Sequence, residues 1–330
     1  MMFPVDEMHG SHIDMRVSVV IPAYNAARFL PEAVESVQKQ MPPVHEIIIV
    51  DDGSTDDTEQ VVASRGQDIK YVRQQNAGPS TARNRGIAMA SGSLVAFLDA
   101  DDVWTVDKIA EQLAVFHANP DVGLVASDMA EIDTGGGIIR PSVLAAHGLL
   151  SFFQTLNGAP VPQAVRRLTE KNFIPTGTVI VKRNLLVELG GFQPDIRYGE
   201  DLELWARIAA RAPIVCLPRV HMLRRQHGLN ATQATAPMLR DLVKVMQHLR
   251  VACGAELRAQ GAVPDVFVAR ALFDLGYWHF TANEFDAARI AFDQSLSAKP
   301  SLRTAVYAAA SRLPASLVHK ARKAKQFLEN

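Results

Sequence analysis

Three acidic residues follow a short apolar stretch in the first third of the chain. Asp99, Asp101 and Asp102 come directly after residues 94–98, which are all apolar. Like charges this close together repel one another unless a positive group lies between them. Mg²⁺ and Mn²⁺ prefer carboxylate oxygen and keep coordination positions open for phosphate. The Asp-x-Asp spacing therefore predicts a divalent cation site that holds a diphosphate, with a helix cap at Asp102 as the alternative interpretation.

A second acidic pair follows another apolar stretch, because Asp51 and Asp52 come directly after residues 47–50. Ser54 and Asp57 have the spacing of a capping box, which accounts for both of them. The capping box does not explain Asp51 and Asp52. Two adjacent carboxylates at the end of a buried strand cost free energy unless they accept hydrogen bonds. The sequence therefore predicts that a donor such as a base or a ribose lies against this pair.

Two arginines follow a turn in the same half of the chain. Arg83, Asn84 and Arg85 lie in a helix-like stretch after the turn at residues 76–79. Helix spacing cannot place all three on one face, and one inward arginine could bind a diphosphate through its planar guanidinium. Exposed cations on a solvated helix are the alternative interpretation.

A third acidic pair stands later in the chain. Glu200 and Asp201 follow Gly199 at the start of the helix-like run DLELWARIA. A general base must be ionised and within hydrogen-bond reach of its substrate, and a glycine lets a substrate approach the backbone closely. The alternative is that Asp201 caps the helix. Trp205 is expected in the core, and His227 in the basic run HMLRRQHG would by itself be an ordinary loop histidine.

The elements that must position these residues follow an α/β pattern between Val17 and Val125. Consecutive apolar positions indicate strands that helices cover on both faces, and such sheets are mostly parallel. Ligands then bind at the carboxyl ends of the strands, so the acidic strand ends should converge on one crevice. Strands are predicted at 17–23, 45–52, 68–74, 92–102 and 121–127, and helices at 26–40, 54–66, 78–91 and 105–120.

The pattern becomes irregular after Ser127. The stretch from there to about Pro175 has poor periodicity and is too long for an ordinary connection, which suits a binding or lid segment. Regular elements then return. Strands are predicted at 176–183 and 213–220, and helices at 184–191 and 201–212.

From about Ala236 the chain is predicted to be wholly helical. We therefore divide it into an N-terminal extension (1–15), an α/β domain (16–235) and a helical C-terminal region (236–330). One tetratricopeptide-like hairpin is predicted in the last region, from the spacing of Leu275, Gly276, Ala288, Phe292 and Pro300. The basic tail 316–327 reads as a solvated terminal helix, with attachment to an anionic membrane surface as the alternative.

The composition describes a globular chain. Its 330 residues are 48% apolar and 21% charged, and 34 basic against 35 acidic residues give a net charge of −1. This balance offers no electrostatic reason to expect a nucleic-acid partner. No apolar run is long enough to span a membrane and the first residues lack signal-peptide features, so we expect a cytoplasmic protein. Cys216 and Cys253 lack the spacing of a zinc site and are expected to be buried thiols.

Taken together, these motifs resemble the family 2 inverting glycosyltransferases with the GT-A nucleotide-sugar fold. The matching segments stand in the family's order and cover roughly residues 16 to 232. They are VSVVIPAYNAARFLPEAVESV, EIIIVDDGSTDDT, NAGPSTARNRGIAMASGSLVAFLDADD, TGTVIVKRNLLVELGGF, GEDLELWARIA and RRQHGLNAT. The resemblance implies a Rossmann-like mixed, mostly parallel sheet flanked by helices, with the all-helical C-terminal region added to it.

The resemblance also assigns roles. It implies that Asp101 holds Mg²⁺ or Mn²⁺ and that His227 approaches the diphosphate or this metal. It also implies that Arg83 lies near the diphosphate and that Asp99 contacts the nucleotide sugar. The acceptor base corresponds to the pair Glu200 and Asp201, most often to its second member. The donor site as a whole is implied to include Pro22, Ala23, Tyr24, Asn25, Asp51, Asp52, Arg83, Asp99 and Ala100.

These roles describe an enzyme of polysaccharide or glycoconjugate biosynthesis. We expect it to move a sugar from a nucleoside diphosphate, with UDP as the expected nucleotide, to a saccharide, lipid-linked or other hydroxyl acceptor. Peripheral contact with the inner face of the membrane through the basic tail is the alternative to a purely cytoplasmic location. A nicotinamide oxidoreductase is disfavoured because no Gly-x-Gly-x-x-Gly follows the first strand. A non-catalytic interaction protein that uses the helical region is the remaining alternative.

Overall fold

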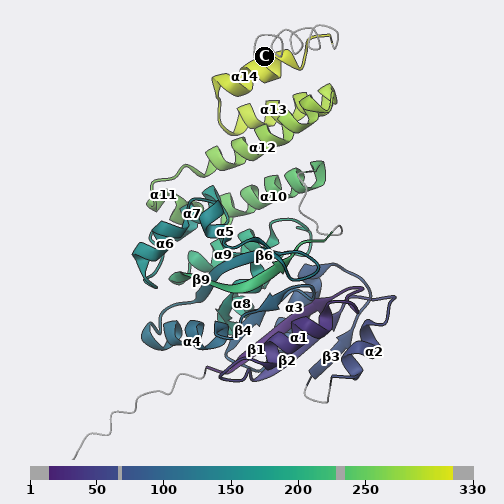
Figure 1. Cartoon of the computed structure of the whole chain (residues 1–330). Helices are drawn as coiled ribbons and strands as arrows, with labels where there is room; N and C mark the ends of the chain where they lie inside the picture. Colours follow the sequence, from purple (N-terminus) through teal and green to yellow (C-terminus); the bar gives the residue numbers. More distant parts are fainter. Residues whose placement is uncertain (1–14, 66–68, 228–234, 315–330) are drawn as a thin grey trace, which may run out of the picture.

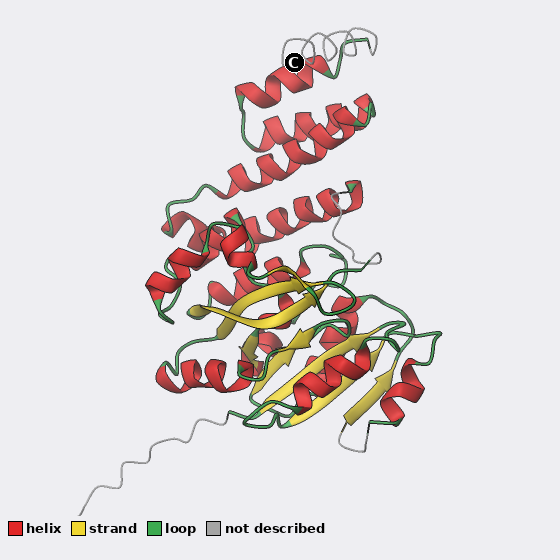
Figure 2. Ribbon diagram, in the orientation of Figure 1, coloured by secondary structure: helices red, strands yellow, loops and turns green. Residues whose placement is uncertain are grey.

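The computed structural model describes residues 15–65, 69–227 and 235–314. A sheet with helices on both sides forms the larger part, and the C-terminal helices stack into a column that rises from it (Figures 1 and 2). This arrangement confirms the predicted fold class. The extension 1–14 and the basic tail 316–327 lie outside the described residues, so the expectations for them are not tested. Within the described ranges no helix is long and apolar enough to cross a membrane.

The strands form one mixed sheet in the order β3-β2-β1-β4-β8-β6-β9-β5, with β7 paired to β6. β1, β2, β3, β4, β6 and β9 run in one direction, and β5, β7 and β8 run against them. The strands are β1 (Val17–Ala23), β2 (Glu46–Asp51), β3 (Ile69–Arg73), β4 (Leu94–Phe97), β5 (Val103–Trp104), β6 (Leu124–Ile132), β7 (Ile138–Arg140), β8 (Ile180–Lys182) and β9 (Ile214–Arg225).

Helices lie between the strands and continue to the C-terminal column. The α/β part contains α1 (Leu30–Gln38), α2 (Thr58–Ala63), α3 (Pro79–Met89), α4 (Lys108–Ala118), α5 (Val143–Ala146), α6 (Leu150–Leu156), α7 (Ala164–Glu170), a 3₁₀ turn η1 (Thr176–Thr178), α8 (Arg183–Glu188) and α9 (Glu200–Ala209). The column contains α10 (Ala236–Ala252), α11 (Gly254–Ala259), α12 (Pro264–Thr281), α13 (Phe285–Ala298) and α14 (Leu302–Ala310).

The two faces of the sheet have separate apolar cores, which explains the consecutive apolar positions in the strands. Successive side chains of a strand point to opposite faces. Val19 and Ile21 therefore join the core beneath α1, which includes Leu30. Val20 joins the core on the other face, together with Phe97. Because both faces are covered, a strand such as β1 needs apolar residues at every position.

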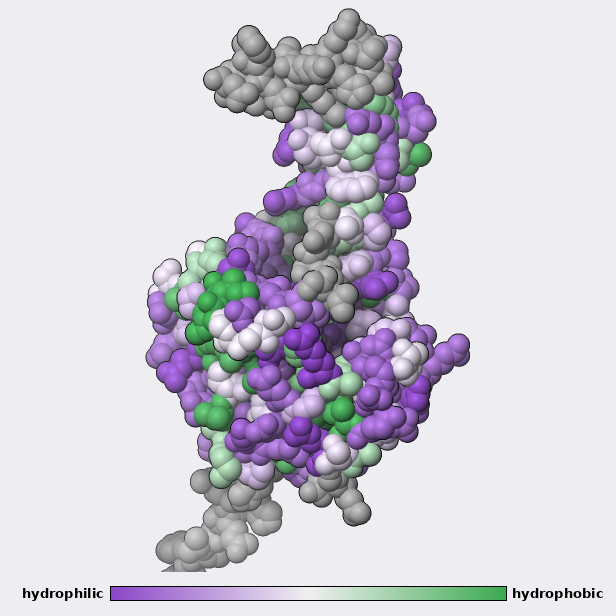
Figure 3. Space-filling model, turned by 45° about the vertical axis from the view of Figure 1, so that its right-hand side comes forward, coloured by the Kyte–Doolittle hydropathy of each residue, from purple (hydrophilic) through white to green (hydrophobic). Residues whose placement is uncertain are grey.

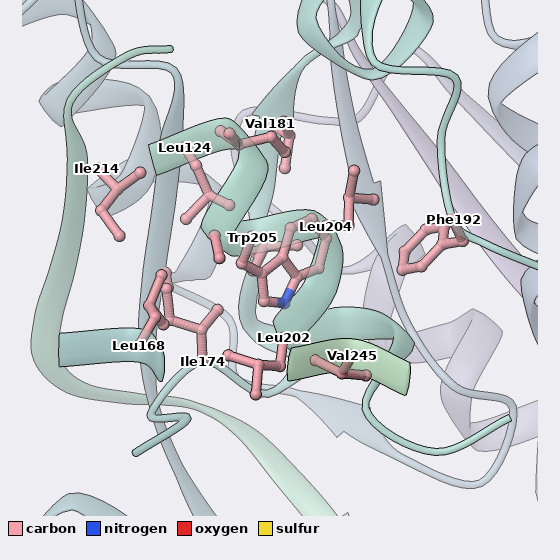
Figure 4. Packing of buried hydrophobic residues seen from close by; sticks show 14 of the residues in the cluster. Leu124, Leu168, Ile174, Val181, Phe192, Leu202, Leu204, Trp205, Ile214 and Val245 are labelled. Carbon is pink, nitrogen blue, oxygen red and sulfur yellow. The ribbon is translucent and has the colours of Figure 1, made fainter. Parts of the chain in front are cut away.

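Trp205 of α9 lies at the centre of the second core, as predicted (Figure 4). Its side chain is fully buried, and its ring lies 5.6 Å from that of Phe192 and 6.2 Å from that of Phe97, centroid to centroid. Leu202 of the same helix and Val245 of α10 belong to the same core. α10 thus packs directly on the helix that carries the late acidic pair, although the composition changes just before it.

In the C-terminal column α12 packs against α13, and the tetratricopeptide-like character of this pair remains a prediction. Gly276 allows the close approach of the two helices, because a Cβ there would lie 2.7 Å from the ring of Phe292. α14 then packs against α13. The proposed division of the chain into domains at residue 235 remains a prediction.

Two expectations about local structure are corrected. The stretch from Ser127 to Pro175 is more regular than its sequence suggests, since it completes β6 and contains β7 and α5 to α7. The capping box at Ser54 and Asp57 is also wrong. The Ser54 hydroxyl accepts a hydrogen bond from the backbone N–H of Asn25, and α2 begins only at Thr58 without a side-chain cap. Asn25, which binds the Ser54 hydroxyl, lies in the loop after β1. The spacing of the residues around Ser54 cannot indicate a partner that is so distant in the chain.

Candidate active site

The acidic loop after β4 has a positive or donating partner for each carboxylate. Arg83 of α3 donates from Nη2 to Oδ1 of Asp99 at 2.8 Å. His227, just beyond β9, lies with Nε2 2.8 Å from Oδ2 of Asp101. The Asp99 and Asp101 side chains are 39% and 33% exposed, so ligands can reach both. The charges that the sequence left unbalanced are thus partly compensated by the protein.

Asp102 differs from its neighbours because it is buried. Its Oδ1 accepts a hydrogen bond from the backbone N–H of Arg225 at 2.9 Å. Burial raises the pKa of Asp102 well above its usual range, and the nearby charges of Asp101 and Asp99 add to this effect. The alternative interpretation of Asp102 as a helix cap is wrong, because α4 begins at Lys108. Asp102 instead ties the acidic loop to the end of β9.

Asp51 is fully buried at the end of β2. Its Oδ1 accepts from the backbone N–H of Ser54 at 2.8 Å, and its Oδ2 accepts from the Tyr71 hydroxyl at 2.6 Å. No base or ribose is needed to explain its burial, and it has no exposed surface with which to line a nucleotide site. Asp51 therefore supports the loop after β2, and its place in the donor site remains a prediction.

Asp52 is nearly buried and receives three hydrogen bonds from the turn before α3. The donors are Nε2 of Gln74 at 2.7 Å and the backbone N–H groups of Ala77 and Gly78 at 2.9 and 2.8 Å. The protein thus supplies the donors that the sequence reasoning assigned to a base or ribose. Asp52 holds the turn that leads into the helix of Arg83, and its contact with a nucleotide remains a prediction.

The end of β1 forms the neighbouring part of the predicted donor site. Ala23 is buried and Pro22 partly so, whereas the Tyr24 side chain is 54% exposed. Asn25 has a φ of +49° and accepts from the backbone N–H of Thr55 at 2.8 Å. This bond joins the loops after β1 and β2. Tyr24 is the large side chain that this edge leaves open to a ligand, whereas Ala100 of the acidic loop is buried.

Arg83 also reaches the late acidic pair. Its Nη1 donates to Oε1 of Glu200 at 2.9 Å, so one buried guanidinium bridges Asp99 and Glu200. The guanidinium stacks over the ring of Phe192 at 5.4 Å. Burial disfavours its charge, but Asp99 and Glu200 outweigh this effect and raise the pKa of Arg83. The sequence predicted one inward arginine in this helix, and the structure identifies it as Arg83.

Glu200 and Asp201 are held differently at the start of α9. Burial raises the pKa of Glu200 to about 7, although Arg83 opposes the shift. Asp201 accepts from the backbone N–H of Leu202 at 2.6 Å and from Nδ2 of Asn172 at 3.2 Å, and burial raises its pKa too. The helix cap is Gly199 with a φ of +82°, so the alternative of Asp201 as the cap is wrong.

Asn172 is a site residue that the sequence analysis did not identify. It precedes η1 in the irregular stretch before Pro175 and donates to Asp201. Nothing in its local sequence marks it, because the bond depends on the packing of the α7 segment against α9. Its position indicates that the irregular stretch reaches the late acidic pair.

A divalent cation would find two protein ligands here. The described part of the chain contains no group of three or more His, Cys, Asp or Glu side chains that could hold a metal ion. Asp101 and His227 nevertheless offer one carboxylate oxygen and one imidazole nitrogen 2.8 Å apart. Mg²⁺ is commonly held by one or two carboxylates together with substrate phosphates and water. These residues therefore fit a cation that arrives with a diphosphate.

A mixed α/β sheet with helices on both faces and an acidic loop at its strand ends is the arrangement of the GT-A fold class. The chain belongs to glycosyl transferase family 2, whose family model matches residues 18–183. The family assignment confirms the resemblance that the sequence motifs indicated, and it sets aside a nicotinamide oxidoreductase.

Known relatives and structures agree with this assignment. An uncharacterized glycosyltransferase of Rickettsia felis is 35% identical over 203 residues, which are 61% of this chain and 31% of the relative. The chain thus spans about a third of the length of such relatives. Staphylococcus aureus TarS 1–349 in complex with UDP-GlcNAc has a TM-score of 0.60 at 20% identity, over 94% of this chain and 88% of TarS. A Pyrobaculum calidifontis mannosyltransferase in complex with GDP-Man and Mn²⁺ has a TM-score of 0.55 at 22% identity, over 89% and 78%.

Proposed function

We propose that the protein is an inverting glycosyltransferase that moves a sugar from a nucleoside diphosphate, with UDP as the expected nucleotide, to a hydroxyl acceptor. The observation that carries the proposal is the bridge from Arg83 to Asp99 and Glu200. It links the loop expected to bind the donor with the acidic pair expected to meet the acceptor. Direct transfer between two substrates needs both half-sites side by side.

Asp201 acts as the general base in this proposal. It takes the proton of the acceptor hydroxyl while the acceptor oxygen forms a bond to the anomeric carbon. The bond from that carbon to the diphosphate oxygen breaks on the opposite side, so the configuration inverts and no covalent intermediate with the enzyme forms. Burial raises the pKa of Asp201, which makes its carboxylate a stronger base. Glu200 is engaged by Arg83 and orients the acceptor.

The departing diphosphate develops negative charge, which the donor half-site must offset. Arg83 brings a buried positive charge to this loop, and Asp101 with His227 is the proposed cation site. A bound Mg²⁺ or Mn²⁺ would supply Lewis-acid stabilisation of the leaving group. Tyr24, exposed at the end of β1, is available to pack against the base. UDP is favoured over other nucleotides by the TarS complex with UDP-GlcNAc, and metal use by the mannosyltransferase complex with Mn²⁺.

Hydrolysis of a nucleoside diphosphate sugar in the presence of Mn²⁺ tests the proposal. Release of nucleoside diphosphate by the wild type, and its loss in Asp201→Asn, would support an enzyme that activates a hydroxyl or water at this carboxylate. A non-catalytic interaction protein that uses the helical column predicts no turnover in either protein. A polysaccharide or glycoconjugate as the final acceptor, and a location in the cytoplasm or at the inner face of the membrane, remain parts of the proposal.

A further inference from the structure

The buried guanidinium of Arg225 joins three segments around the predicted donor site. Arg225 is the last residue of β9 and is 3% exposed. Its Nη2 donates to Oε2 of Glu32 at 2.6 Å, its Nε to the backbone oxygen of Asp101 at 3.3 Å, and its Nη1 to that of Asp133 at 3.4 Å. Its own backbone N–H donates to Asp102. One residue thus connects α1, the acidic loop and the turn between β6 and β7.

The same arginine lies against the ring that supports His227. Phe29, directly before α1, stacks on the His227 imidazole with 5.4 Å between ring centroids and 18° between planes. The Arg225 guanidinium lies over the same Phe29 ring at 5.2 Å from its centroid. Stacking and cation–π contacts have preferred geometries and restrict the orientation of the rings. Phe29 therefore limits how the imidazole of His227 can turn.

From these contacts we infer that Arg225 and Phe29 are positioning residues for the metal and diphosphate half-site. Asp101 and His227 come from two segments, and a cation binds both only if these segments are held at a fixed spacing. Arg225 fixes the loop of Asp101 through its backbone oxygen, and Phe29 fixes the imidazole plane of His227. Both residues act through Asp101 and His227 in this inference. Ligands held in advance bind with a smaller loss of conformational entropy.

This inference rests on the proposed function, because it assumes that Asp101 and His227 meet a cation carried by a diphosphate. A purely structural role for the Arg225 ion pair is the competing explanation. It predicts that losing the pair lowers stability but leaves metal affinity unchanged. Arg219, on the same strand, provides a matched control, because it forms a 2.8 Å ion pair with Glu111 that involves none of the site residues.

The test measures Mn²⁺ affinity of the full chain saturated with UDP, by electron paramagnetic resonance of free Mn²⁺. Arg225→Gln and Phe29→Leu should each weaken Mn²⁺ binding roughly 10- to 100-fold, the usual effect of removing groups that support metal ligands. Phe29→Tyr keeps the ring and should restore wild-type affinity, and Arg219→Gln should leave it unchanged. Wild-type affinity in Arg225→Gln and Phe29→Leu, or an equal loss in Arg219→Gln, would overturn the inference.

A second readout separates this inference from the proposed function. The His227 imidazole resonances of the ligand-free protein, assigned with His227→Gln, report the ring current of Phe29. They should shift in Phe29→Leu and Arg225→Gln but not in Arg219→Gln. If the wild type binds no UDP and Mn²⁺ while these shifts occur, the proposed function fails and the positioning of His227 stands. Unchanged resonances in both variants would overturn the positioning role itself.

Discussion

The Nε2 atom of His227 lies 2.8 Å from Oδ2 of Asp101, although 126 positions separate the two residues in the chain. The fold therefore brings together a carboxylate from the loop after β4 and an imidazole from the end of β9. Both are ligands that Mg²⁺ or Mn²⁺ accepts, and both side chains are reachable from solvent. A cation arriving with a diphosphate would replace the hydrogen bond between them.

Asp101→Ala is expected to abolish sugar transfer while leaving the fold intact, because this carboxylate serves the cation and not the core. EDTA should have the same effect on the wild type. Transfer is measured with a nucleoside diphosphate sugar, and folding by circular dichroism and thermal unfolding. Asp107→Asn is the control, since Asp107 lies in the same segment, and its side chain makes no capping bond to α4. Full activity in Asp101→Ala would show that the acidic loop serves only structure.

Asp201→Asn is expected to lower the transfer rate by about 10² to 10⁴, the usual contribution of a general base. Asparagine keeps the shape of the side chain and its capacity to accept from Leu202, but it loses the basic charge. Donor affinity should change little, because the base acts on the acceptor. Steady-state kinetics of transfer and equilibrium binding of the donor measure the two effects separately.

Glu200→Gln should be milder and should raise mainly the KM for the acceptor. Glu200 is held by Arg83 at 2.9 Å and is assigned to orientation, not to proton transfer. If Glu200→Gln stops turnover and Asp201→Asn spares it, the two roles are exchanged. Kinetics of both variants with the same acceptor distinguish these outcomes.

Burial of Glu200 should also make stability depend on pH. Its pKa is raised from 4.5 to about 7 in the folded protein, mainly by burial. The unfolded chain releases this proton near pH 4.5, whereas the folded chain keeps it until about pH 7. The free energy of unfolding should therefore fall as the pH rises from 4.5 to 7, with an upper bound of about 3 kcal/mol.

Glu200→Gln removes this titration, so its free energy of unfolding should fall less over the same interval. Urea denaturation at pH 5 and pH 8 gives the difference for each protein. The slope with pH is the readout, because Glu200→Gln also alters the hydrogen bond from Arg83 and can therefore change the stability at both pH values. Glu188→Gln, at an exposed position, is the control. Equal slopes in the wild type and Glu200→Gln would show that the carboxylate ionises normally.

The sequence predicted the alternating elements of the α/β part because each carries its signal locally. Consecutive apolar residues in β1 and β2 and the turn residues between them do not depend on distant partners. The hydrogen-bond partners of the acidic residues, in contrast, come from distant segments of the chain. Asp51 and Asp52 look alike in the sequence, yet Tyr71 of β3 holds the first and the turn before α3 holds the second. Local spacing could not separate a supporting carboxylate from one nearer the crevice.

The contacts of Arg225 were also difficult to predict, although the alternation of side chains along a strand gave one local signal. It stands in the basic run HMLRRQHG, which by itself suggests no role for this arginine. Alternate positions of an extended chain share a face, so Arg225 and His227 could have been placed together. Its bonds to Glu32 and Asp133 could not, because they join segments far apart in the chain. Nothing in the sequence indicates a role for Asn172, because the stretch from Ser127 to Pro175 lacks a clear hydrophobic periodicity.

The helical column is expected to support the α/β part without supplying reactive groups. α10 shares the main core through Val245 and Leu249, so a chain ending at residue 236 should unfold or aggregate. A chain ending at Gly261 keeps α10 and α11 and should bind the donor with near wild-type affinity, at a lower unfolding temperature. Donor binding and thermal unfolding of both truncations are the measurements. Loss of donor binding in a folded 1–261 chain would mean that part of the donor site lies beyond residue 261.

The proposed donor site at the acidic loop can be tested by equilibrium binding of nucleoside diphosphates. Isothermal titration calorimetry of the wild type with UDP, GDP, ADP and dTDP, each with Mn²⁺, asks whether the acidic loop is a donor site. We expect saturable binding of at least one nucleotide, with UDP binding best, and a marked loss of affinity in Asp101→Ala or with EDTA. Absence of binding by every nucleotide in the presence of Mn²⁺ would contradict this expectation.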